Sequence, residues 1–103
     1  MPREHERYPH FIEIVLESAS GKREARISDI SIGGCFIDSI AGVFVTERIS
    51  FVVKADDGRI VDFNGEVTYI FPGIGFGVKF IDLSDEASDY LRHAISSQTG
   101  TET

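Results

Sequence analysis

The sequence predicts an all-β protein, a small six-stranded antiparallel β-barrel followed by one C-terminal α-helix. Apolar and polar residues alternate along several short segments, and turn-forming residues separate those segments. The spacing typical of an amphipathic helix occurs near the C-terminus. Because short turns can join antiparallel strands but not parallel ones, these connections favour a barrel over βαβ units.

Composition limits the class of protein. A chain of 103 residues with 42% hydrophobic residues can form one folded domain around a single core. No apolar run approaches the roughly 20 residues that span a bilayer, and Met1 to His5 lack the apolar segment of a secretion signal. We therefore expect a cytoplasmic protein without membrane insertion.

Charge and cysteine content narrow the partners. A net charge of −7 disfavours binding to duplex nucleic acid, which depends on an excess of Lys and Arg. The lone cysteine, Cys35, excludes an internal disulfide and multi-cysteine zinc sites, and we expect it to be a buried apolar residue. We predict no metal site and no resident cofactor.

The N-terminal third predicts an arm and two strands. Residues 1–9 contain two prolines and no apolar periodicity, and we expect a flexible arm there. Residues 11–17 alternate as a strand, a turn follows, and residues 23–30 form the second strand. We expect the barrel and its helix together to occupy residues 10–95.

The middle of the chain predicts three more strands. A corner at residues 31–34 leads into a short strand, and a loop follows over residues 38–47. Residues 49–55 alternate up to an Asp-Gly pair that is typical of a tight hairpin turn. The returning strand, residues 61–69, places apolar residues on one face: Val61, Phe63, Val67 and Tyr69.

The C-terminal segment predicts the last strand and the helix. After a Pro-Gly turn, residues 74–80 show the clearest alternation in the chain. Ser84 is a candidate N-cap, and Arg92 and His93 are expected near the helix end. We expect residues 96–103 to form a disordered tail. The helix has one apolar stripe: Ala87, Tyr90, Leu91, Ala94 and Ile95.

Two short motifs carry the candidate chemistry. Arg3 and Arg7 form an R-x-x-x-R pair whose guanidinium groups can donate to phosphates and to guanine and can stack on bases. Asp29, Ser31 and Gly34 form a D-x-S-x-x-G corner with a carboxylate, a hydroxyl and a permissive backbone. Taken alone, the arginines also fit a solvated arm, and the corner also fits an ordinary turn between strands.

With both motifs in this order, the sequence resembles the PilZ domain family of bacterial cyclic di-GMP receptors. The family signature is R-x-x-x-R followed by [DN]-x-S-x-x-G, and residues 73–80 look like the last strand of that family. The resemblance covers roughly residues 3–95. It implies a PilZ-like split barrel that binds cyclic di-GMP and has no enzymatic activity.

The resemblance also implies a role for each motif residue. Arg3 and Arg7 would grip the phosphate and guanine surfaces, Asp29 and Ser31 would bond a guanine edge, and Gly34 would keep the corner open. Asp29 would discriminate against adenine, because an unmatched buried polar group costs about 1 to 3 kcal/mol.

The arm is expected to order over the ligand and to pass the signal to an unidentified protein partner. One feature departs from the family, since Pro2 stands where many members carry an additional Arg. The number of bound ligand molecules, one or two, therefore stays open.

Three other functions compete with this one. A PilZ-like interaction module would use the same barrel without binding the nucleotide. A small barrel can also bind single-stranded nucleic acid, although the net charge of −7 opposes this. An enzyme is disfavoured, because His5, His10 and His93 have no Cys or carboxylate at metal-ligand spacing around them.

Overall fold

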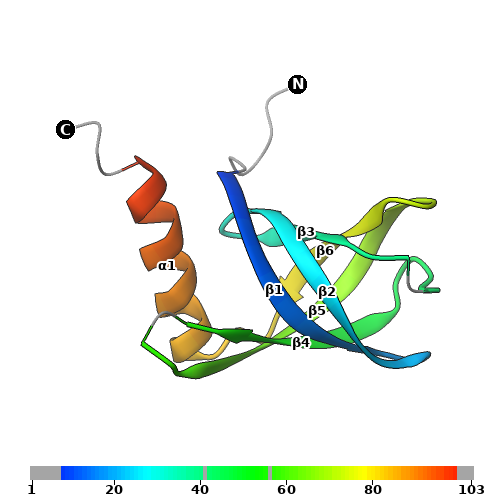
Figure 1. Ribbon diagram of the computed structural model, residues 1–103, viewed down its shortest axis with the longest axis horizontal. Helices are drawn as coiled ribbons and strands as arrows, with labels where there is room; N and C mark the ends of the chain where they lie inside the picture. Colours follow the sequence, from blue (N-terminus) through cyan, green and yellow to red (C-terminus); the bar gives the residue numbers. More distant parts are fainter. Residues whose placement is uncertain (1–7, 41, 56, 100–103) are drawn as a thin grey trace.

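The structure is a computed structural model that describes residues 8–40, 42–55 and 57–99, the last three by their backbone alone. Six antiparallel strands form a closed barrel in the order β1-β2-β3-β6-β5-β4, and helix α1 lies at one end of it (Figure 1). The predicted fold class is confirmed. The elements are β1 (Tyr8–Ser18), β2 (Gly21–Ile30), β3 (Gly34–Asp38), β4 (Arg48–Lys54), β5 (Ile60–Phe71), β6 (Gly75–Ile81) and α1 (Asp85–Thr99).

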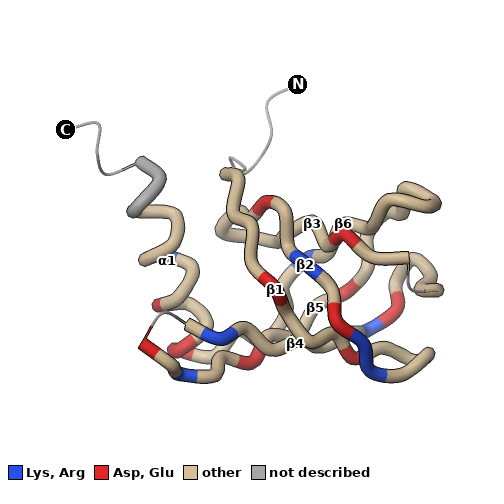
Figure 2. The backbone as a smooth tube through the Cα atoms, viewed as in Figure 1, with Lys and Arg blue, Asp and Glu red and all other residues tan. Residues whose placement is uncertain are grey.

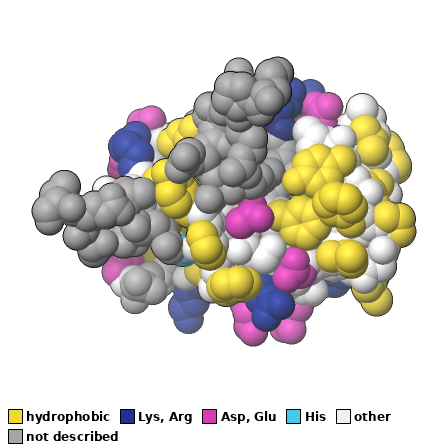
Figure 3. Space-filling model, turned by 90° about the horizontal axis from the view of Figure 1, so that it is seen from above, with side chains coloured by type: hydrophobic (Ala, Val, Ile, Leu, Met, Phe, Trp, Pro, Cys, Tyr) yellow, Lys and Arg dark blue, Asp and Glu magenta, His cyan; other side chains and the backbone are white. Residues whose placement is uncertain are grey.

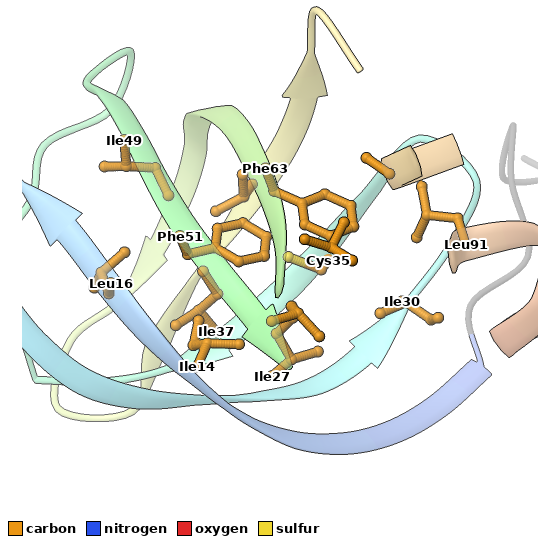
Figure 4. Packing of buried hydrophobic residues seen from close by; sticks show 14 of the residues in the cluster. Ile14, Leu16, Ile27, Ile30, Cys35, Ile37, Ile49, Phe51, Phe63 and Leu91 are labelled. Carbon is orange, nitrogen blue, oxygen red and sulfur yellow. The ribbon is translucent and has the colours of Figure 1, made fainter. Parts of the chain in front are cut away.

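The core fills the inside of the barrel (Figure 4). Alternate residues of the strands point inward, as in β1, where Ile14 and Leu16 are buried and the residues on either side of each are exposed. Phe51 and Phe63 stack in this core with their ring centroids 5.0 Å apart. Cys35 is fully buried, which confirms its expected apolar role.

Strand β1 begins earlier than the alternation predicts. Tyr8 pairs with Ile30 and Pro9 pairs with Asp29, so the last two residues of the predicted arm, 1–9, belong to the sheet. A register shift follows Pro9, as is usual where a proline cannot donate to the ladder. The earlier part of the predicted arm lies outside the described residues.

A bulge reverses the faces of β5 near its end. The register of β5 against β6 shifts between Val67 and Tyr69, which makes Thr68 the extra residue. Val67 is fully buried, whereas Tyr69 is 37% exposed. The prediction that Tyr69 shares the inner face of Val61 and Phe63 is therefore wrong.

Helix α1 begins as predicted and ends later. The Ser84 hydroxyl accepts a hydrogen bond of 3.0 Å from the backbone N–H of Ala87, as an N-cap does. The helix continues to Thr99, so four residues of the predicted disordered tail, 96–103, are helical instead. Extending an existing helix costs much less than nucleating one, even through residues of modest helix propensity. Arg92 consequently lies in the middle of the helix and not near its end.

Tyr90 joins the helix to the start of β1. Its hydroxyl lies 2.8 Å from His10 Nε2, and its ring meets the core ring of Phe63 edge to face, with centroids 6.0 Å apart. Ala87 and Leu91 are buried beside it. The predicted apolar stripe thus packs onto the barrel, next to the strand that follows the arginine motif.

Candidate functional site

The corner between β2 and β3 is held by the Ser31 side chain. Ser31 is only 5% exposed. Its hydroxyl accepts hydrogen bonds from the backbone N–H groups of Gly33, at 3.2 Å, and Gly34, at 3.0 Å. It donates to the carbonyl of Gly34 at 3.2 Å. One donor and two acceptor positions are all that a hydroxyl has, so the side chain of Ser31 is fully used inside the turn.

Ser31→Ala is therefore expected to lower the stability of the folded protein. The variant leaves one buried and one partly buried backbone N–H group without this acceptor, which lowers the free energy of unfolding by about 1 to 3 kcal/mol. Urea unfolding followed by circular dichroism measures the change. Ser20→Ala is the matched control, because the Ser20 hydroxyl bonds only in an exposed pair with Ser18. Equal stability of the two variants would contradict the structural role of Ser31.

Gly34 is required by the neighbouring strand. It pairs with Lys79 of β6, and a Cβ atom at Gly34 would overlap the carbonyl oxygen of Val78. The preceding residue, Gly33, accepts a hydrogen bond of 2.9 Å from the N–H of Phe80. The corner is thus fastened to β6 by close backbone contact, which only a glycine permits.

A bulge in β2 turns Asp29 outward. The register of β2 against β3 shifts between Ile27 and Asp29. As a result both Ile27 and Ile30 point into the core, and Asp29 lies on the outer face, half-buried. In the register of the sheet, Asp29 stands between Pro9 of β1 and Phe36 of β3.

The structure brings three of the five predicted site residues together: Asp29, Ser31 and Gly34 share one corner. Arg3 and Arg7 lie outside the described residues. The strand that follows them starts at this corner, because Tyr8 is paired with Ile30.

Most described arginines are paired with acids away from the corner. Figure 2 marks the basic and acidic positions along the backbone. Arg26 lies 3.2 Å from Asp38, Arg59 lies 2.8 Å from Asp57, and Arg92 bonds Asp89. The backbone N–H of Arg59 bonds the Asp57 carboxylate, and this bond, together with the guanidinium, lowers the pKa of Asp57. Such exposed pairs contribute little to stability.

A groove elsewhere on the surface does not include the corner. It lies between α1 and the β4–β5 hairpin, lined in part by Arg59, Tyr90 and Arg92. Asp29, Ser31 and Gly34 are not among its lining residues. In the described part of the chain no cluster of His, Cys, Asp and Glu could hold a metal ion. Across residues 8–40, 42–55 and 57–99, no helix is long and apolar enough to cross a membrane.

An aromatic cluster beside the corner escaped sequence reasoning. Phe36, Tyr69 and Phe71 lie together on the outer face, with ring centroids 5.5 to 6.1 Å apart. Simple alternation places Tyr69 inside the barrel, and the bulge before it could not be predicted. The available signal was the pair Gly75 and Gly77, which leaves the outer face of β6 without side chains at these two positions.

Known proteins share this architecture. The inhibitor of motility from Bacillus subtilis superposes with a TM-score of 0.75 at 14% identity, over 97% of this chain and 52% of its own. YcgR from Escherichia coli, in complex with c-di-GMP, gives a TM-score of 0.75 at 16% identity, over 99% of this chain and 48% of its own. The chain thus spans about half the length of these two proteins.

A shorter relative matches along its whole length. The PilZ domain of CeSA from a cellulose-synthesizing bacterium gives a TM-score of 0.65 at 19% identity, over 95% of this chain and 99% of its own. No curated protein matches the sequence significantly. The family model of the PilZ domain matches residues 2–97. Because that match includes both motifs, all six strands and most of the helix, the chain belongs to the PilZ domain family.

Proposed function

We propose that this protein is a cytoplasmic bacterial receptor for cyclic di-GMP, without enzymatic activity of its own. The observation that carries the proposal is the pairing of Tyr8 with Ile30 and of Pro9 with Asp29. The R-x-x-x-R motif ends at Arg7, the residue before Tyr8, and consecutive Cα atoms are about 3.8 Å apart. The chain thus enters the barrel at the corner directly after the arginine motif, which supports a site formed by both halves of the signature.

The chemistry of the corner suits a guanine. A carboxylate only accepts hydrogen bonds when ionised, and guanine presents two adjacent N–H donors on its pairing edge. Asp29 is half-buried on the outer face, so its side chain is partly shielded from water and a ligand can still reach it. A net charge of −7 disfavours the binding of an anionic ligand, and Arg3 and Arg7 supply the cations that its phosphates need.

Calorimetric titration with cyclic di-GMP tests this proposal. We expect the wild-type chain to bind and Asp29→Asn to bind at least about tenfold more weakly, because the amide turns one acceptor into a donor that faces the donors of guanine. Asp62→Asn is the matched control, since Asp62 is an exposed acid of β5 and the change in charge is the same. Absence of binding by the wild-type chain would refute the proposal.

We further propose that the arm orders over the ligand and that a protein partner reads the ordered state. The support is the place where the arm joins the barrel, because Tyr8 pairs with Ile30 at the corner and His10 Nε2 lies 2.8 Å from the hydroxyl of Tyr90 in α1. Ordering of residues 1–7 would therefore occur beside two elements at once.

A PilZ-like interaction module that does not bind the nucleotide is the second candidate. The exposed apolar residues favour it, among them Ile40, which is 79% exposed, and Ile74, which is 63% exposed. This candidate predicts no heat of binding with cyclic di-GMP, so the same titration separates the two functions.

A further inference from the structure

The outer face of the barrel carries an aromatic surface next to the corner. Phe36 stacks on Tyr69 with an interplanar angle of 28° and ring centroids 6.1 Å apart. Phe71 borders both rings, at 6.0 Å from Phe36 and 5.5 Å from Tyr69. Tyr69 is 37% exposed and Phe71 is 54% exposed. Figure 3 shows hydrophobic side chains gathered on this side of the molecule, with acidic side chains at their border.

The two glycines of β6 make room for these rings. A Cβ atom on Gly77 would overlap the Tyr69 ring, and one on Gly75 would lie 2.8 Å from Cε2 of Phe36. The rings therefore cover the bare backbone of β6 from the strands on either side. Their arrangement is fixed by the backbone below them and by one another.

The aromatic surface is continuous with Asp29 in the register of the sheet. Asp29 pairs with Phe36, Phe36 pairs with Gly77, and Gly77 pairs with Tyr69. Side chains at paired positions on one face have Cβ atoms about 5 Å apart. A purine whose edge is held by Asp29 therefore extends over β3, where the Phe36 ring lies.

We propose that Phe36, supported by Tyr69 and Phe71, is the platform on which the guanine held by Asp29 stacks. The inference rests on the proposed function and assigns to these rings a part of the binding that the two motifs do not provide. Asp29 recognises the edge of the base and Phe36 its face. The surface is bordered by charged side chains: Asp29 is paired with Phe36, and the exposed Lys79 lies two residues after Gly77 in β6. A planar ligand with polar edges therefore fits this surface better than an apolar protein segment does.

The first test is a set of substitutions at Phe36. Removing a base-stacking ring costs binding, so Phe36→Ala should raise the Kd for cyclic di-GMP at least about tenfold. Phe36→Leu keeps apolar bulk without the aromatic face and should also weaken binding, whereas Phe36→Tyr should retain it. Ile60→Ala is the control, because Ile60 is 58% exposed at the far end of β5. Thermal unfolding of each variant shows that it is folded under the titration conditions.

The second test needs no substitution. A stacked guanine shifts the proton resonances of the Phe36 ring through its ring current, and saturating cyclic di-GMP should produce that shift in the wild-type chain. A merely structural role for Phe36 would not produce it. If the wild-type chain binds but Phe36→Ala keeps the same Kd and the ring resonances do not move, the platform is refuted and the proposed function stands. Absence of wild-type binding refutes both.

Discussion

Gly34→Ala is expected to lower the free energy of unfolding by about 3 kcal/mol, the upper range for forcing extra atoms into a packed site. The methyl group would overlap the carbonyl oxygen of Val78 and would lie 3.2 Å from its carbonyl carbon. These are backbone atoms of a paired strand, so no side-chain rotation can relieve the overlap. The ladder between β3 and β6 must open instead, and the corner that carries Asp29 opens with it.

The same substitution at Gly42 provides the control. A Cβ atom there would meet nothing within 4 Å, and the backbone does not require positive φ. Gly42→Ala should therefore leave stability within about 0.5 kcal/mol of wild type, as is usual for surface changes. Denaturant unfolding of both variants measures the difference. If Gly34→Ala were as stable as Gly42→Ala, β3 and β6 would not approach each other as closely as described.

Arg7→Ala is expected to weaken the binding of cyclic di-GMP by about 2 kcal/mol or more, which is about 30-fold in Kd. Arg7 is the residue directly before Tyr8, which pairs with Ile30 at the corner. Truncation would remove a charged contact and leave a ligand phosphate without its cation. Calorimetric titration measures the loss.

Arg48→Ala is the matched control for this loss. It removes the same charge, but Arg48 lies in β4 and only approaches Glu66, at 3.9 Å. A long-range charge effect would weaken both variants equally, whereas a direct contact weakens only Arg7→Ala. Hydrogen exchange of residues 1–10 completes the test, because ligand should protect this segment in the wild-type chain and less in Arg7→Ala. An exchange pattern that is unaffected by saturating ligand would refute arm ordering.

The strands and the helix could be predicted because their patterns are local. In β6, for example, Phe76 and Val78 alternate with glycines, and period-two alternation needs no knowledge of the neighbouring strands. The Ser84 cap could be predicted for the same reason, since an N-cap bonds the first turn of its own helix. The predicted ends of the elements were less accurate, because they depend on distant residues. Tyr8 belongs to β1 since it pairs with Ile30, which is 22 residues away in the sequence.

The bulges could not be predicted for the same reason. Nothing in the local sequence around Thr68 or Ser28 announces an extra residue, because a bulge exists only relative to the strand that it faces. One bulge moves Tyr69 to the outer face and the other places Asp29 there while keeping Ile30 in the core. The bulge in β5 thus brings Tyr69 into the aromatic surface, and the bulge in β2 places Asp29 beside that surface.

The fold class and the family could be predicted from the sequence, and both are confirmed; the five site residues remain a prediction from the motifs. Their types and spacings are covalent properties of the chain. Three relations follow only from the tertiary structure. The Ser31 hydroxyl forms its hydrogen bonds within the turn, and the backbone of Val78 leaves no room for a Cβ atom at Gly34. Asp29 is paired with Phe36. Those relations depend on how separate strands pair, and pairing is settled by the burial of the whole core.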